Sequence, residues 1–236
     1  KDEAGNGYAT AAPLMALQGL ATLRIDFMGN GDSTASYRDY NYTSAVIDAK
    51  AAADYLAGLE TVDGGNLGVM GWSQGGTDAL LAAEAHPDTF QAVVTWSGAL
   101  ELNGASLFAG TSFEDAYAQA KKEGFYTMTF DWREPLELGE RWFQEVAETN
   151  ILKVTADIKA PILAINGKDD TTVTPDNAEK IVKAAANADS QLLLVDNCDH
   201  TYNVFSGDFT ALYQTVDATA AFFQAQLIPA AAQAAA

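Results

Sequence analysis

A turn with the pattern Gly-x-Ser-x-Gly, placed between a short apolar run and a helical pattern, constrains this chain more than any other feature. The run Leu67–Met70 predicts a buried strand, Gly71–Gly75 carries the turn, and Thr77–His86 predicts a helix. So sharp a turn from strand to helix leaves no room for side chains at its two glycines. It also lifts the serine out of the sheet in a strained backbone conformation. The pattern therefore predicts a sheet covered by helices, with Ser73 exposed at one edge.

Ser73 in this setting is predicted to be a nucleophile. A serine hydroxyl is weakly nucleophilic and needs a base beside it. The N–H of Gln74 would lie at a helix N-terminus, where free N–H groups and the helix dipole favour negative charge, so Gln74 is the candidate oxyanion donor. The alternative is a Gly/Ser turn without chemistry, because the bare pattern often arises by chance. The flanking strand and helix favour the nucleophile.

Strand and helix patterns alternate along most of the chain, which predicts an α/β fold with a mostly parallel sheet and helices on both faces. We expect residues 1–236 to form a single domain. The remaining predicted helices are 8–19, 42–59, 175–186 and 207–227, and the remaining predicted strands are 21–27, 92–96, 161–166 and 191–195.

The alternation stops between residues 98 and 157, a stretch rich in aromatic side chains with two predicted helices, 112–123 and 135–148. We interpret it as a helical cap inserted over the carboxyl edge of the sheet, where open α/β sheets bind ligands. Its aromatic residues Phe130, Trp132 and Trp142 are the candidate substrate-binding residues. The alternative is that these aromatic residues only pack on the core. The alanine-rich residues 229–236 are predicted to be a peripheral tail.

The chain contains two histidines, and a histidine ordinarily titrates near neutral pH, as a catalytic base must. His86 ends a predicted helix and is expected to be structural. His200 follows the last predicted strand, on the edge where Ser73 emerges, and is the candidate base. A carboxylate that orients it should follow an intermediate strand, where Asp169 and Asp170 both qualify and Glu101 is a more distant choice.

Four segments resemble motifs of the α/β-hydrolase superfamily. More narrowly, they are similar to its single-domain serine esterases, the feruloyl/cinnamoyl esterases and dienelactone-hydrolase-like proteins. The chain order Ser…Asp…His matches, and the resemblance places the acid on Asp170. The matching segments are Arg24–Ser33 ("R-x-D-F-x-G-x-G-x-S"), Gly71–Gly76, Asn166–Val173 ("H-G-x-x-D-x-x-V") and Asp199–Tyr202 ("D-H-T-F").

The resemblance implies a serine hydrolase that cleaves small to medium or aromatic carboxylic esters through an acyl-enzyme. It implies no cofactor, and the sequence has no cluster of histidines or cysteines with metal-ligand spacing. The same triad could serve a thioesterase or a carbon–carbon bond hydrolase, and the chain could also be a non-catalytic ligand-binding relative. The family usually carries a His-Gly segment and earlier strands before the position of Lys1. Without them we expect weak activity or low stability, and no residue here is assigned as the second oxyanion donor.

Charge and composition restrict the partners. The 32 acidic and 13 basic residues give a formal net charge of −19, which disfavours nucleic acid and anionic membranes. No apolar run is long enough to span a bilayer, so no membrane insertion is expected. The single cysteine, Cys198, and the lack of a visible signal peptide favour a cytoplasmic location, although a mature secreted form would lack one too. The oligomeric state is left unassigned.

Overall fold

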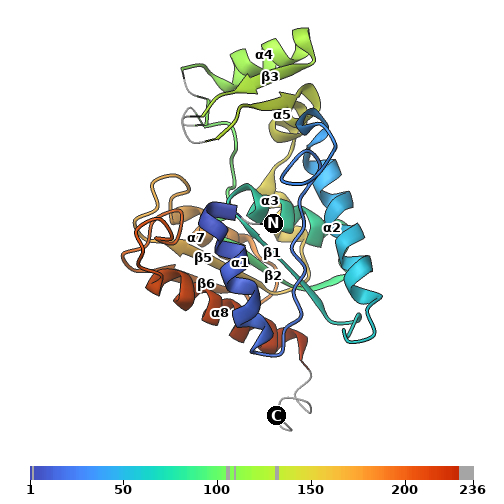
Figure 1. The fold of residues 1–236 in the computed structure, drawn as a ribbon, viewed down its shortest axis with the longest axis vertical. Coiled ribbons are helices and arrows are strands. Elements are labelled where there is room, and N and C mark those ends of the chain that lie inside the picture. Colours follow the sequence, from blue (N-terminus) through green and yellow to red (C-terminus); the bar gives the residue numbers. More distant parts are fainter. Residues whose placement is uncertain (2, 105–106, 109, 131–132, 229–236) are drawn as a thin grey trace.

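A four-stranded parallel sheet lies at the centre of the computed structural model, which describes residues 1–228 except 2, 105–106, 109 and 131–132. The strand order is β1-β2-β5-β6, and every neighbouring pair is parallel (Figure 1). The predicted parallel sheet is confirmed, and the carboxyl ends of its strands share one edge. The predicted tail and Trp132 lie outside the described residues. The strands are β1 (Leu67–Trp72), β2 (Phe90–Trp96), β5 (Ile162–Gly167) and β6 (Gln191–Val195).

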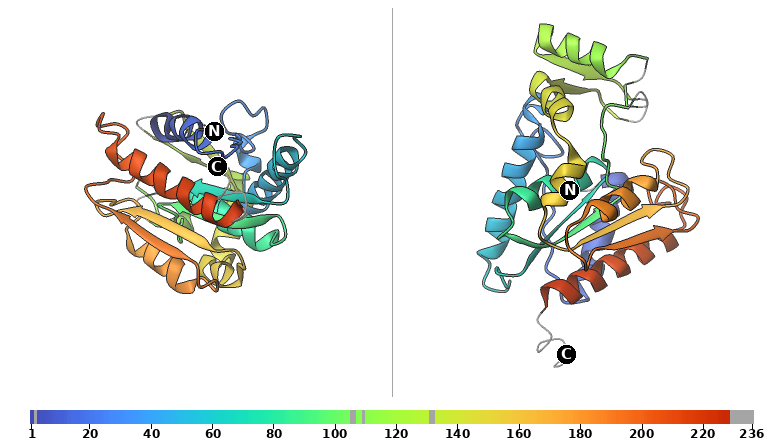
Figure 2. Two further views of the ribbon diagram at one scale, coloured as in Figure 1. Left: turned by 90° about the horizontal axis from the view of Figure 1, so that it is seen from below. Right: turned by 180° about the vertical axis from the view of Figure 1, so that it is seen from behind.

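Helices cover both faces of the sheet, as the alternating pattern predicts (Figure 2). Helices α1 and α8 pack on each other and cover one face. Helices α3 and α7 cover the opposite face, and α2 and α6 pack on α3. The helices are α1 (Glu3–Ala16), α2 (Tyr42–Ala57, preceded by the 3₁₀ turn η1, Tyr37–Asp39), α3 (Gln74–Ala85), α6 (Ile151–Asp157), α7 (Asp176–Ala184) and α8 (Thr210–Leu227).

The strands carry two apolar cores, one on each face. In β2, Val93 packs in the core on the α3 side, whereas Ala92 and Val94 pack in the core on the α8 side. All three side chains are fully buried. A strand covered on both faces is apolar at consecutive positions, which explains why the runs of this sheet show no alternation with polar residues.

The prediction of a strand at residues 21–27 is wrong. The segment is extended, but it pairs with no strand in the described part of the chain, and the sheet ends at β1. Residues 21–24 are exposed. An open hollow of about 430 Å³, lined by Ile25, Met28 and Tyr55 among others, lies between this segment and α2. An apolar run becomes a strand only where a neighbouring backbone accepts and donates its hydrogen bonds, and no local pattern reveals that neighbour.

The insertion, residues 98–157, contains a hairpin that the sequence pattern missed. The predicted helix 135–148 is a strand over its first residues, because Leu136 and Leu138 alternate with Glu137 at the period of a strand. The hairpin and two helices form a tier that stands apart from the sheet (Figure 1). Its elements are α4 (Phe113–Glu123), β3 (Phe125–Met128), β4 (Leu136–Gly139) and α5 (Glu140–Glu148).

Two groups of polar contacts join this insertion to the body. Arg38 in η1 donates to Glu137 of β4 at 2.8 Å, and its guanidinium lies over the Phe125 ring, 3.6 Å from the centroid. Glu145 of α5 accepts hydrogen bonds from the N–H and hydroxyl of Thr43, at 2.9 and 2.6 Å. The η1 turn and the first turn of α2 therefore hold the insertion, although about 100 residues separate the partners in sequence.

Candidate active site

Ser73 occupies the turn between β1 and α3 in a backbone conformation that few residues adopt. Its φ and ψ are 57° and −121°, and its N–H donates to Trp96 O at 2.9 Å. A Cβ on Gly71 would lie 1.8 Å from Gly75 O, so only glycine fits at position 71. The predicted glycine requirement is thus explained at Gly71 by a direct backbone contact. It is wrong at Gly75, where an added Cβ would meet only the Tyr8 hydroxyl, at 3.9 Å.

Three loops at the carboxyl edge of the sheet bring Ser73, His200 and Asp170 together. His200 Nε2 lies 3.1 Å from Ser73 Oγ, and His200 Nδ1 lies 2.8 Å from Asp170 Oδ2. The three residues follow β1, β6 and β5, and 127 positions separate the serine from the histidine. A parallel sheet makes this convergence possible, because its strands all end at the same edge.

Asp170, rather than its neighbour, faces the histidine. Its side chain is fully buried, and Oδ1 accepts from the N–H groups of Thr172 and Val173 at 2.9 and 2.8 Å. Burial alone would raise the pKa of Asp170. The hydrogen bond and the electrostatic attraction to His200, together with the hydrogen bond from the Val173 N–H, hold that pKa below its usual value. Asp169 and Glu101 are both exposed.

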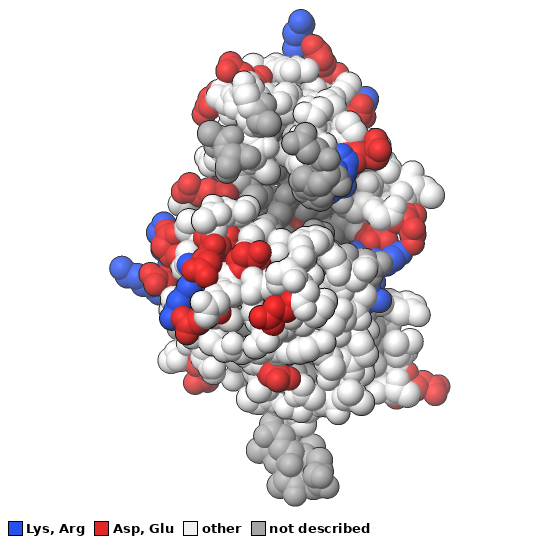
Figure 3. All heavy atoms as spheres, turned by 60° about the vertical axis from the view of Figure 1, so that its left-hand side comes forward, with Lys and Arg blue, Asp and Glu red and all other residues white. Residues whose placement is uncertain are grey.

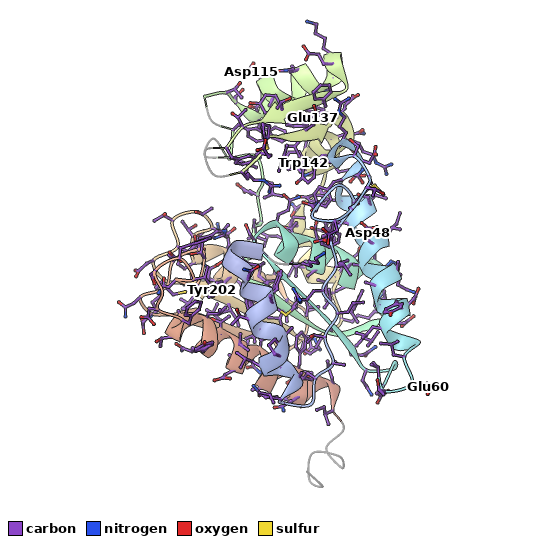
Figure 4. The ribbon with its side chains drawn as sticks, viewed as in Figure 1. Asp48, Glu60, Asp115, Glu137, Trp142 and Tyr202 are labelled. Carbon is purple, nitrogen blue, oxygen red and sulfur yellow. The ribbon has the colours of Figure 1, made fainter. Side chains whose placement is uncertain are left out.

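Trp72 and Tyr202, which the sequence analysis did not single out, support the histidine loop. The buried indole of Trp72 donates its N–H to His200 O at 3.0 Å. Tyr202, two residues after the histidine, is buried in the body (Figure 4) and donates to Ile165 O at 3.2 Å. The only sequence signal was position, since Trp72 directly precedes Ser73.

The other candidate residues lie in different surroundings. Gln74 is the first residue of α3, where its backbone N–H has no carbonyl of the same helix to bind. Phe130 is half-buried and packs against the core on the α3 side. Trp142 is 1% exposed inside the insertion (Figure 4), with its ring centroid 5.0 Å from that of Phe143. The burial of Trp142 fits the alternative interpretation, in which these aromatic residues only pack on the core.

The part of the chain that the structure describes carries neither a metal cluster nor a membrane span. Among those residues, no group of three histidine, cysteine, aspartate or glutamate side chains could hold a metal ion. No helix within the same residues is long and apolar enough to cross a membrane. Figure 3 shows acidic side chains scattered over one face of the molecule rather than gathered into a block.

A sequence profile of the prolyl oligopeptidase family matches residues 7–228, nearly the whole chain. The chain belongs to this family. Among curated proteins, human serine hydrolase BPHL is 25% identical over 196 residues, covering 79% of this chain and 66% of the human protein. The chain therefore spans just under two thirds of that relative.

Solved structures similar to this prolyl oligopeptidase family member share its fold. Est1E from Butyrivibrio proteoclasticus with bound ferulic acid aligns with a TM-score of 0.77 and 21% identity, over 94% of this chain and 84% of that one. A monoacylglycerol lipase of Paleococcus ferrophilus aligns with a TM-score of 0.71 and 18% identity, over 93% and 89% of the two chains. The predicted α/β-hydrolase fold is confirmed, and so is the resemblance to the serine hydrolases of this superfamily.

Proposed function

We propose that this protein is a serine hydrolase that cleaves carboxylic esters through an acyl-enzyme. The observation that carries the proposal is the continuous hydrogen-bonded chain from Ser73 Oγ through His200 to the buried Asp170, built on a strained turn at a helix N-terminus. Family membership and the monoacylglycerol lipase among the structural neighbours support the same chemistry.

The mechanism follows from these positions. Ser73 Oγ attacks the ester carbonyl while His200 Nε2 takes its proton, and the N–H of Gln74 stabilises the oxyanion. Asp170 holds the imidazole with Nδ1 protonated and stabilises its charged form. His200 then protonates the leaving alcohol, and a water activated by the same imidazole releases the acid.

Labelling with a fluorophosphonate tests whether the serine is activated. The native protein should react and Ser73→Ala should not, whereas an exposed serine such as Ser206 should be replaceable by alanine without loss. A folded native protein that takes no label would favour the non-catalytic ligand-binding alternative.

A substrate panel tests the ester preference. The ferulic acid bound to Est1E favours apolar or aromatic acyl groups. We expect turnover of p-nitrophenyl acetate, butyrate and octanoate and of methyl ferulate. Peptide cleavage is a second candidate because the family is named for an oligopeptidase. A peptide p-nitroanilide turned over faster than every ester would establish it, and a faster thioester would favour the thioesterase alternative.

A further inference from the structure

Behind the proposed nucleophile, three polar side chains from two distant segments form a chain of hydrogen bonds that begins half-buried at Gln74 and ends fully buried at Asp78. Gln74 Nε2 donates to Tyr40 Oη at 3.0 Å, and Tyr40 donates to Asp78 Oδ2 at 2.6 Å. Gln74 and Asp78 lie one turn apart on the same face of α3, and the tyrosine comes from the end of η1. The Tyr40 hydroxyl therefore bridges the first turn of α3 to the second.

The carboxylate of this chain occupies an unfavourable place. Asp78 is 3% exposed and is flanked in α3 by buried alanines and leucines. Its Oδ1 has no hydrogen-bond partner among the described residues. A carboxylate without full compensation destabilises a folded core, and an alanine would fill this helix position without that penalty. The stability of the fold therefore does not explain Asp78, and the hydrogen bond to Tyr40 is the specific interaction that it provides.

Tyr40 is held as firmly as its partner. The residue is 4% exposed, its ring stacks on Tyr37 with centroids 5.3 Å apart, and Phe27 lies 6.1 Å away. With its ring fixed by packing and its proton directed at Asp78, the tyrosine oxygen presents a lone pair to Gln74. The side chain of Gln74 is thus restrained by a rigid acceptor outside its own helix.

We propose that Tyr40 and Asp78 are positioning residues for Gln74, an inference that rests on the proposed hydrolase function. Through the hydrogen bond to the Gln74 amide they hold the first turn of α3, so that the Gln74 N–H faces the oxyanion. Oxyanion donors act only within a narrow range of distance, so a small displacement of this residue lowers the rate of the chemical step.

Tyr40→Phe is the direct test, because it removes one hydroxyl and keeps the packed ring. With p-nitrophenyl butyrate, kcat should fall about tenfold and KM should change less than twofold, as expected when an interaction acts in the transition state alone. Gln74→Ala keeps the backbone N–H and should show a similar fall. The double variant Tyr40→Phe/Gln74→Ala should be no slower than Gln74→Ala alone, because both substitutions break the same chain of hydrogen bonds. Tyr42→Phe is the matched control, because Tyr42 is a neighbouring buried tyrosine that makes no hydrogen bond to Gln74 or Asp78 in the described part of the chain.

Two further variants separate positioning from folding. Tyr40→Phe leaves the Asp78 carboxylate unpaired, so Tyr40→Phe with Asp78→Asn removes the hydroxyl and the charge together and should still show the fall in kcat. Asp78→Asn alone keeps an acceptor oxygen for Tyr40, so its kcat should lie between that of the native protein and that of Tyr40→Phe. An unchanged kcat in Tyr40→Phe would overturn the inference while the hydrolase function stands. The same holds if the kcat losses of Tyr40→Phe and Gln74→Ala multiply in the double variant. A native protein that neither hydrolyses the ester nor takes the phosphonate label would overturn both.

Discussion

Replacing Asp78 by asparagine should stabilise the protein by an amount that depends on pH. Burial raises the pKa of Asp78 from its ordinary 3.8 to about 7, and the hydrogen bond from Tyr40 offsets only part of that rise. Tyr40 donates to this carboxyl and Tyr42 lies near it, and burial raises the pKa of both tyrosines above the usual value. Asp78 is therefore the group of this cluster that changes charge between pH 5 and pH 8.

The sign follows from proton uptake. The folded chain binds a proton at Asp78 more tightly than the unfolded chain, so this contribution to stability is present at low pH and is lost as pH rises through the folded pKa. From pH 5 to pH 8 the loss spans about two pKa units, which is about 2.7 kcal/mol. Asparagine has nearly the shape of the protonated carboxyl and does not titrate. The stability of Asp78→Asn relative to the native protein should therefore grow by about 2.7 kcal/mol over this range.

Urea unfolding followed by tryptophan fluorescence measures the effect. With an m-value near about 3 kcal/mol/M, the variant should gain about 1 M in midpoint over the native protein between pH 5 and pH 8. All other titrating groups are shared by the two proteins, so their contributions cancel in the comparison. Asp88→Asn removes the same charge from an exposed position and serves as the control. A stability difference for Asp78→Asn that stays constant with pH would refute the reasoning.

The site and the surface support four further predictions. Gly71→Ala should destabilise the fold by about 3 kcal/mol, because its methyl group would meet a backbone oxygen; an unchanged melting temperature would contradict this. Asp170→Asn should lower kcat by about 10⁴-fold, because the correct imidazole tautomer is lost. Asp169→Asn, at the exposed neighbouring position, should retain the native kcat. Equal losses in the two variants would speak against Asp170 as the residue that orients His200. Trp72→Phe keeps an aromatic ring but removes the N–H that binds His200 O, so kcat should fall about tenfold, and an equal rise in KM alone would argue for substrate contact instead. The net charge of −19 should make the thermal midpoint rise as KCl increases from about 10 mM to about 1 M, and a flat or falling response would rule out adaptation to salt.

The features that sequence analysis predicted correctly are those determined by neighbouring residues. A strand, a turn and a helix follow one another around Ser73, and each is specified by period, glycine placement or apolar content. The alternation of such units predicted the parallel sheet, and a parallel sheet predicted the shared edge at which His200 would meet Ser73. With only two histidines in the chain, elimination selected His200 as the candidate base, and the structure places it beside Ser73.

The errors and omissions involve partners that lie far away in sequence. Residues 21–27 have the apolar content of a strand but no pairing strand among the described residues. The choice between Asp169 and Asp170 needed a family resemblance, because adjacent loop residues differ only in which one the fold buries. Trp142 looked like a pocket residue from its type alone, but packing within the insertion buries it.

The sequence by itself determined the local elements, their order and the chemical types available at the site. Only the tertiary structure decided which groups touch, including the bridge from Gln74 through Tyr40 to Asp78 and the indole N–H on the carbonyl of His200. The physical reason is that strand pairing, burial and hydrogen bonds depend on atoms contributed by segments as much as 206 positions apart. A pattern read along the chain records only what lies next to a residue, whereas these interactions depend on what lies across from it.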